Sequence, residues 1–154
     1  MQEIDASANI KSLAESPHIL LDPVLAKQQV ANIRDGLTAA SPENKAIYQA
    51  NAKTFIRQLE KLEAEYKQSL QKYPNCTFIS FYDAYPDLAN RYQIKQVALV
   101  EIPEDQLSPT DVQKAINAVK QYKAEAILGE SGFASSHING NFTAKVRNRS
   151  RRFA

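Results

Sequence analysis

Most hydrophobic residues in residues 23–39 and 42–72 are spaced three or four positions apart, which is the period of an amphipathic helix. The apolar side of the first stretch consists of Leu25, Val30, Ile33 and Leu37. The apolar side of the second consists of Ile47, Phe55, Leu59, Leu62, Tyr66 and Leu70. About thirty residues rising ~1.5 Å each predict a rod of ~45 Å. The pattern alone leaves two interpretations open: a surface helix packed on a core, or a spine between two lobes.

Three proline dipeptides mark the expected helix starts. Asp22-Pro23, Ser41-Pro42 and Ser108-Pro109 each place a capping side chain before a proline. An Asp or Ser at this position accepts a free backbone N–H, and proline at the first helical position forfeits no hydrogen bond. We therefore expect helices to begin directly after these three residues.

The pattern changes after Asn75, where continuous apolar runs replace the helical period. Short apolar runs at 76–81, 97–102 and 126–128 predict buried strands, and residues 83–92 and 108–122 predict helices between them. Strands that alternate with helices predict a parallel sheet. The expected fold class is α/β: a long helix followed by a small parallel sheet flanked by helices.

The composition and the motifs of the chain exclude several classes of protein. The chain has 154 residues, 44% hydrophobic and 23% charged, as in an ordinary globular domain. Its single cysteine, Cys76, excludes a disulfide framework and a cysteine-based zinc finger. The sequence has no phosphate-binding glycine loop and no Gly-x-Ser-x-Gly elbow, and acid–base pairs such as Glu63 and Lys67 fit a solvated helix face. We therefore do not expect an enzyme.

The net charge of +2 conceals an asymmetry. Residues 134–154 carry five Lys or Arg and no acidic residue, so this tail is +5 and residues 1–133 are −3. Such a tail could contact the phosphates of nucleic acid or of an anionic membrane. Its abrupt change of composition also fits a shifted reading frame, and we expect a disordered tail.

Three segments, in order, resemble one known family. They are SPHILLDPVLAKQQVANIRDGL, SPENKAIYQANAKTFIRQLEKLEAEY and FISFYDAYPDLANRYQIKQVALVEIPEDQLSPTDVQKAINAVKQYKAEAILGES, and the resemblance as a whole covers roughly residues 5–133. The first resembles the Asp-Pro-His-x-Trp-Leu-Asp-Pro segment of the zinc and manganese solute-binding proteins of bacterial ABC importers, the cluster A-I or cluster nine family. The second resembles the long interlobe helix of this family, and the third the start of its C-terminal lobe.

The resemblance implies two α/β lobes joined by a long helix, with the metal ion between them. It assigns residues 1–22 to the remainder of an N-terminal lobe and 23–73 to a helical linker that includes the spine. It assigns residues 74–133 to a partial C-terminal lobe, followed by the basic tail 134–154. We expect the chain to be a fragment of the family fold without an export signal of its own.

The resemblance also places the metal ligands, one residue at a time. His18 matches the second His ligand, whereas the first His ligand of the family has no counterpart here. Asp83-Ala84 and Arg91-Tyr92 fix a register that puts Tyr82 at the third ligand position, which is His in zinc binders and Glu in manganese binders. A phenol with a pKa near ~10 is a poor ligand. Glu130 matches a Glu that is normally not a ligand, and no counterpart of the Asp ligand follows it.

The function expected from this resemblance is a zinc- or manganese-binding component of an ABC uptake system, present as an incomplete and impaired copy. The metal ion would be the transported ligand, although this chain could bind none. The partner implied is an ABC permease, the location periplasmic or membrane-anchored, and no nucleic acid is expected. His137 is interpreted as a loop residue. The alternatives are a helical interaction module whose basic tail contacts nucleic acid or membrane, and a non-functional fragment.

Overall fold

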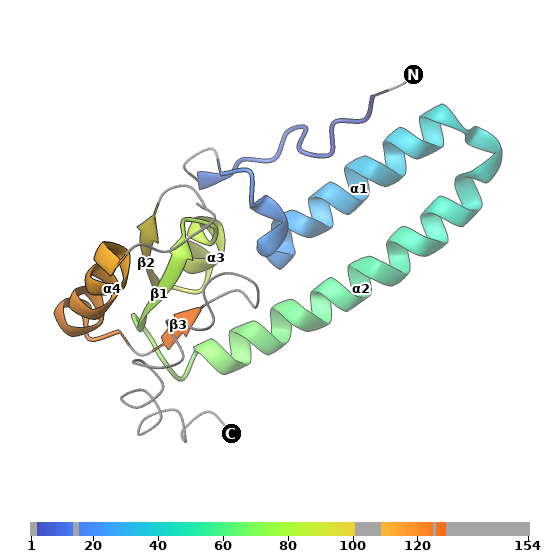
Figure 1. The fold of residues 1–154 in the computed structure, drawn as a ribbon. Helices are drawn as coiled ribbons and strands as arrows, with labels where there is room; N and C mark the ends of the chain where they lie inside the picture. Colours follow the sequence, from blue (N-terminus) through green and yellow to red (C-terminus); the bar gives the residue numbers. More distant parts are fainter. Residues whose placement is uncertain (1–2, 14–15, 101–108, 125, 129–154) are drawn as a thin grey trace. The chain divides into compact units, whose positions relative to one another are not determined.

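The computed structural model describes residues 3–13, 16–100, 109–124 and 126–128. It divides into two compact units (Figure 1), each of which is described by itself. The first unit comprises residues 1–73 and 85–92, and the second comprises residues 74–84 and 93–154. The chain therefore leaves the first unit after Tyr73 and returns to it for residues 85–92.

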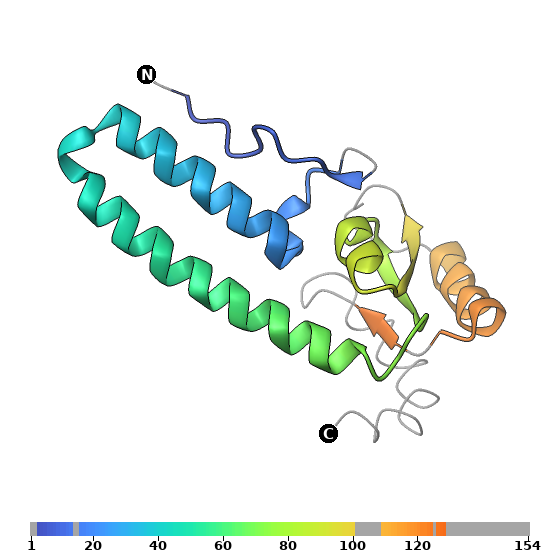
Figure 2. The same cartoon turned by 180° about the vertical axis from the view of Figure 1, so that it is seen from behind.

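Two helices form most of the first unit. Helix α1 spans Pro23–Ala40, and helix α2 spans Lys45–Leu70 and runs without a break. The two helices lie side by side and run in opposite directions, as Figures 1 and 2 show from opposite sides. The long helix predicted from the hydrophobic period is confirmed, except that its first turn, Pro42–Asn44, is a 3-10 turn (η3).

The two predicted caps in this unit have different outcomes. The Asp22 side chain accepts hydrogen bonds from the backbone N–H groups of Val24 and Leu25, so the cap of α1 is confirmed. The Ser41 cap is wrong, because its side chain makes no hydrogen bond to the backbone of the turn that follows. Its hydroxyl oxygen accepts from the Asn44 side-chain amide at 2.9 Å, and its hydroxyl proton is donated to the Glu43 carboxylate. Neighbouring side chains thus take the place of the backbone N–H at this hydroxyl. Ser108 lies outside the described residues.

Small and apolar side chains pack α1 against α2. The buried residues of the two helices are Pro23, Leu25 and Ala26 in α1 and Ala52 and Leu59 in α2. One ion pair also joins the helices, with Lys27 Nζ of α1 2.8 Å from Glu63 Oε2 of α2. This hydrogen bond lowers the pKa of the Glu63 carboxyl. The hairpin is therefore held by apolar burial with one partly exposed charge pair across it.

The N-terminal segment covers part of α1. The Asn32 side-chain amide donates to the backbone oxygens of Ala6, at 3.0 Å, and Ala8, at 2.9 Å. At Gly36 the chain approaches so closely that an added Cβ would lie 2.5 Å from Ile4 Cγ2. Glycine in this helix therefore serves the contact with Ile4, and Figure 2 shows the segment running beside α1.

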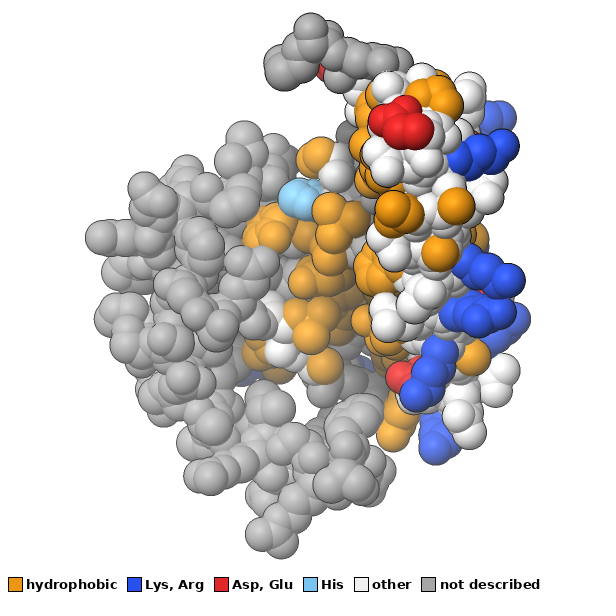
Figure 3. All heavy atoms as spheres, turned by 90° about the vertical axis from the view of Figure 1, so that its right-hand side faces the viewer, with side chains coloured by type: hydrophobic (Ala, Val, Ile, Leu, Met, Phe, Trp, Pro, Cys, Tyr) orange, Lys and Arg blue, Asp and Glu red, His pale blue; other side chains and the backbone are white. Residues whose placement is uncertain are grey.

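An open apolar groove lies between α1 and α2. Its volume is about 300 Å³, and its apolar lining includes Val30, Ile33 and Leu37 of α1 and Ala52 and Phe55 of α2. Ile33 is 42% and Phe55 50% exposed. Figure 3 shows hydrophobic side chains gathered in a band on one face, with Lys and Arg farther out, at the right-hand edge of the view.

We expect this groove to bind a hydrophobic reporter dye when the purified chain is in water. Exposed apolar area is unfavourable in water, and a dye that covers it gains free energy. Replacing both Ile33 and Phe55 with Ser should lower the dye fluorescence. The matched control is Ile47→Ser, because Ile47 is 58% exposed but is not among the groove residues. Equal losses in the two variants would contradict the assignment of the dye to the groove.

Helix α3, Pro86–Arg91, is shorter than the helix predicted over 83–92. The preceding residues form a turn in which the Ala84 N–H donates to the Tyr82 carbonyl at 3.0 Å. A proline disfavours helical backbone in the residue before it, but it is tolerated in the first turn of a helix. Helix α3 therefore begins at Pro86. The helix belongs to the first unit although the strand before it belongs to the second.

The second unit contains a three-stranded sheet. Its strands are β1, Thr77–Tyr82, β2, Lys95–Val100, and β3, Ala126–Leu128. The order is β2-β1-β3 and both pairings are parallel, which confirms the predicted sheet with β1 and β2 shifted by one or two residues. Helix α4, Pro109–Tyr122, contacts β1 and β2.

The core of this unit lies on the central strand. Ile79 is fully buried, Phe78 is 5% exposed and Ala118 of α4 is 8% exposed. Strands alternating with helices thus form the α/β fold expected from the sequence. In the part of the chain that the structure describes, no helix is both long and apolar enough to cross a membrane.

Candidate functional site

The first candidate ligand, His18, lies directly before a short 3-10 turn, η2, Ile19–Leu21. Its backbone N–H lies 3.2 Å from the hydroxyl oxygen of Ser16, to which it donates. Its carbonyl accepts from the N–H of Leu21 at 3.0 Å. The His18 residue is half-buried, and its neighbour Ile19 is 5% exposed. Local hydrogen bonds and the burial of Ile19 therefore fix the backbone of His18.

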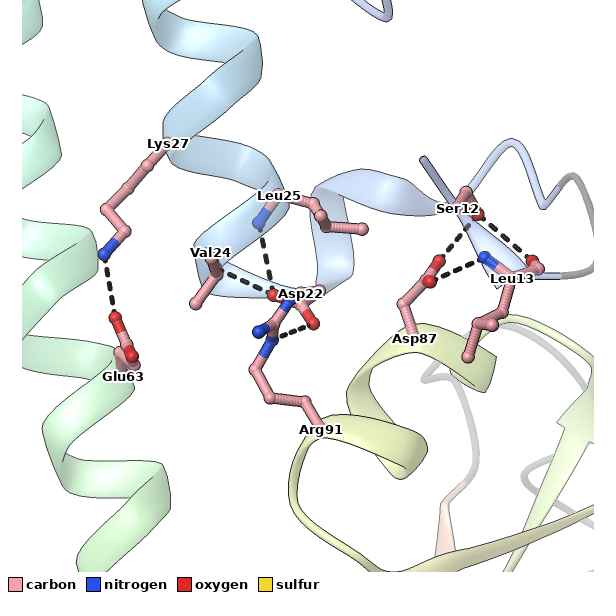
Figure 4. A network of polar contacts seen from close by, with 9 residues as sticks. All are labelled: Ser12, Leu13, Asp22, Val24, Leu25, Lys27, Glu63, Asp87 and Arg91. Atoms are coloured by element: carbon pink, nitrogen blue, oxygen red, sulfur yellow. Dashed lines mark hydrogen bonds and ion pairs between the residues drawn. The ribbon is translucent and has the colours of Figure 1, made fainter. Parts of the chain in front are cut away.

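Asp22 follows η2 directly and is the most buried charged residue that the structure describes in the first unit. Its side chain is 0% exposed and accepts from the N–H groups of Val24, at 2.8 Å, and Leu25, at 3.2 Å. Its other carboxylate oxygen, Oδ2, lies 2.5 Å from Nε of Arg91 in α3 (Figure 4). One carboxylate thus caps α1 and pairs with α3, which satisfies the rule that buried charges are paired and hydrogen-bonded.

A second carboxylate, that of Asp87, binds the chain at Ser12 and Leu13, a few residues before His18. Asp87 of α3 is 9% exposed, and its Oδ2 accepts from the Ser12 hydroxyl at 2.7 Å. Its Oδ1 accepts from the backbone N–H of Leu13 at 2.8 Å. In Figure 4 the Asp87 side chain points from α3 to Ser12 and Leu13, and the Arg91 side chain points from α3 to Asp22.

Two tyrosines lie near this network. The rings of Tyr66 and Tyr92 meet edge to face, with centroids 5.6 Å apart and an interplanar angle of 82°. Burial, with the negative charges of Asp22 and Glu63, raises the pKa of Tyr92 to about 12. Its buried hydroxyl has no hydrogen-bond partner among the described residues. Tyr92 therefore stays neutral at physiological pH and acts through packing.

Tyr82 is the last residue of β1, where it pairs with Val100 of β2. It is half-buried, and its carbonyl accepts from the Gln96 side-chain amide at 3.2 Å. The same Gln96 nitrogen donates to the Ser80 hydroxyl at 2.7 Å. Tyr82 thus lies at the carboxyl end of the central parallel strand, the edge at which open α/β sheets bind ligands.

The predicted site residues fall in different parts of the chain. His18 belongs to the first unit and Tyr82 to the second. Within residues 3–13, 16–100, 109–124 and 126–128, no three His, Cys, Asp or Glu side chains gather as a metal-ligand cluster. Glu130, His137 and the basic tail 134–154 lie outside the described residues.

Two side-chain contacts of α3 were not predicted from the sequence. Asp22 was expected to cap a helix, but its pairing with Arg91, 69 residues away, was not expected. The attachment of Asp87 to Ser12 and Leu13 was not expected either. The available signal was the spacing of four between Asp87 and Arg91, which places both on one helix face.

Comparison with known proteins identifies a family. A family profile described as "Zinc-uptake complex component A periplasmic" matches residues 2–145. The high-affinity zinc uptake system protein ZnuA of Bacillus subtilis is 30% identical over 136 residues, 88% of this chain and 42% of that protein. The zinc-binding lipoprotein AdcA of Streptococcus pneumoniae is 31% identical over 124 residues, 80% of this chain and 25% of that protein.

Solved structures show the same architecture. The crystal structure of ZnuA matches with a TM-score of 0.76 and 28% identity, covering 96% of this chain and 59% of that one. The AdcAII protein of Streptococcus pneumoniae matches with a TM-score of 0.74 and 28% identity, covering 94% and 56%. The chain thus spans less than half the length of the curated relatives and somewhat more than half of these structures.

These relatives are metal-binding transport proteins and not enzymes, as the sequence predicted. Their names place them in the periplasm or on a lipid anchor. The match over nearly the whole chain, with His18 before a capped α1 and a parallel α/β sheet after α2, shows that this chain belongs to the periplasmic zinc-uptake component A family, the solute-binding proteins of ABC zinc uptake.

Proposed function

We propose that this chain serves in zinc uptake and that its own 154 residues hold the ion weakly, with His18 as the main ligand. The observation that carries the proposal is the family match over residues 2–145. The cargo is a divalent ion, zinc by the names of the relatives, with manganese as the competing ion. The partner is the membrane permease of the uptake system, and the place of action is the periplasm or the membrane surface.

The chemistry of His18 supports its role. Neutral imidazole is the commonest metal ligand in proteins, and zinc accepts its nitrogen at ~2.0–2.1 Å. Local hydrogen bonds to Ser16 and Leu21 fix the backbone of His18, as described above. A ligand whose backbone is already fixed loses less conformational freedom when it binds.

The other ligand positions support the weak affinity. Tyr82 occupies the third position, where zinc binders of the family have His, and the first His and the Asp have no counterpart in these 154 residues. Zinc sites need three or four protein ligands in a fixed geometry. One imidazole and one phenol therefore leave most coordination positions to water.

We keep the proposed division into residues 1–22, 23–73, 74–133 and 134–154. The change of unit between Tyr73 and Pro74 supports the second of these boundaries. In this division the two helices α1 and α2 form the linker, and the sheet belongs to the following lobe.

Limited proteolysis should cut close to residues 73–74 before it cuts within α2.

We expect isothermal titration calorimetry of the purified chain to show no zinc or manganese binding tighter than about 1 µM. Complete structural zinc sites reach roughly 10–16 kcal/mol of apparent binding energy, most of which disappears when ligands are missing. The weak binding that remains should be lost in His18→Ala. The matched control is His137→Ala, the chain's other histidine, which should leave the titration unchanged.

Two results would count against the proposal. Nanomolar zinc binding by the unaltered chain would show that other groups complete the site, starting with Asp83, Glu130 and His137. Weak binding that survives in His18→Ala, in a chain with unchanged circular dichroism, would remove His18 from the site.

A further inference from the structure

The segment that carries His18 is attached to helix α3 at both ends. At one end, Ser12 and Leu13 donate to the carboxylate of Asp87 at 2.7 and 2.8 Å. At the other end, Asp22 accepts from Arg91 at 2.5 Å. Because Asp87 and Arg91 are four residues apart, they lie on the same face of α3, one turn from each other.

Burial makes both attachments specific. The Asp22 side chain is 0% exposed, Asp87 is 9% exposed, and the Arg91 side chain is 33% exposed. Hydrogen bonds that involve an ionised group are shorter and stronger than neutral ones, and a low local dielectric strengthens them further. An alternative position of the segment would leave at least one buried carboxylate without a partner, which is costly.

Helix α3 also contacts η2, the 3-10 turn that follows His18 directly. Each of these two elements contains a buried apolar residue, Ala89 in α3 and Ile19 in η2. The His18 segment thus has two polar attachments and one packing contact, all made with one short helix of the same unit.

We propose that Asp22, Asp87 and Arg91 are positioning residues for His18, and that α3 acts as a splint, a rigid support that holds residues 12, 13 and 16–22 in place. The proposal deepens the proposed function, since it names what holds the ligand-bearing segment in place. It also assigns a supporting role to Arg91, which in the family resemblance serves only to set the register. A ligand side chain is useful to a site when its supporting contacts hold it within a fraction of an ångström.

The first experiment removes the attachment at Asp87 and reads the segment directly. In Asp87→Ala, hydrogen exchange of the Leu21 and Asp22 amides, which donate to the carbonyls of His18 and Ile19, should speed up by about tenfold. The His18 imidazole signals in NMR should broaden or shift, and His137→Ala assigns them, because the chain has two histidines. Exchange within α2 should stay unchanged, which shows that the unit is folded.

Conservative and matched variants separate positioning from a general loss of stability. Asp87→Asn keeps an oxygen that can accept from Leu13 and should restore most of the slow exchange. Ser12→Ala removes one of the two hydrogen bonds and should give a smaller acceleration, so it serves if Asp87→Ala fails to fold. Glu63→Ala is the control, because it breaks the Lys27 pair between α1 and α2 without touching residues 12–22.

The outcomes are distinct. Unchanged exchange and unchanged His18 signals in Asp87→Ala would overturn the splint, and so would an equal effect of Glu63→Ala. A zinc titration followed at the same His18 signals tests the proposed function separately. If zinc moves these signals in no variant, the proposed function fails, while exchange and NMR without zinc still decide the splint.

Discussion

Replacing Tyr82 with His should strengthen zinc binding by the purified chain by about tenfold or more, which corresponds to ~1.4 kcal/mol. The change supplies an imidazole at the carboxyl end of β1, the edge at which parallel sheets bind ligands. An imidazole nitrogen suits zinc, whereas a neutral phenol does not. Calorimetry with zinc, compared between the unaltered chain and the variant, measures the gain.

Three controls make the result specific to the ligand position. Tyr82→Phe removes the hydroxyl without adding a nitrogen and should give no gain. Tyr85→His adds an imidazole three residues further on, directly before α3, and should give a smaller gain or none. Adding His18→Ala to Tyr82→His should cancel the gain, because a single imidazole leaves most zinc coordination positions to water. An unchanged affinity in a folded Tyr82→His chain would show that the register is wrong.

Replacing Asp22 with Ala should lower the free energy of unfolding of the first unit by about 3 kcal/mol. Loss of a helix cap costs about 0.5–2 kcal/mol, and breaking a buried ion pair costs about 3–5 kcal/mol when the remaining charge stays buried. The Arg91 side chain is 33% exposed, so water recovers part of that second cost. Urea denaturation followed by far-ultraviolet circular dichroism measures the change, since α1 and α2 dominate the helical signal.

The Asp22→Asn variant separates the contribution of the helix cap to the free energy of unfolding from that of the ion pair with Arg91. Asparagine caps helices as well as aspartate does, so this variant keeps the cap but loses the charge that pairs with Arg91. Its destabilisation should be smaller than that of Asp22→Ala. The matched control is Asp35→Ala, because Asp35 pairs with Arg34 on the surface at 2.8 Å and is 68% exposed. If both alanine variants lowered the midpoint equally, the buried pair would not be a main support of this unit.

Local patterns predicted the elements of this protein well. The 3.6-residue period over residues 42–72 and the Asp22-Pro23 dipeptide predicted α2 and the start of α1, because both depend on neighbours in the chain. The runs at 76–81 and 97–102 predicted β1 and β2 to within two residues. The errors came from neighbouring side chains and from proline: Asn44 and Glu43 bind the hydroxyl of Ser41, and α3 begins only at Pro86.

The sequence could suggest individual candidate ligand positions, but not the contacts that support them. The histidine at 18 and the tyrosine at 82 could be chosen from a resemblance, since each position follows from a local motif. The support around His18 could not, because Asp87 and Arg91 bind residues 69 to 75 positions away in the chain. No local period or cap encodes a contact at such a separation.

The sequence by itself determined the helices, the strands and the parallel α/β class. These properties follow from hydrophobic period and capping, which act within a few residues. Only the tertiary structure decided that α3 leaves the strand it follows and joins the first unit, where it holds Asp22, Ser12 and Leu13. The reason is physical: buried carboxylates require partners, and which partners can reach them depends on how the whole unit packs.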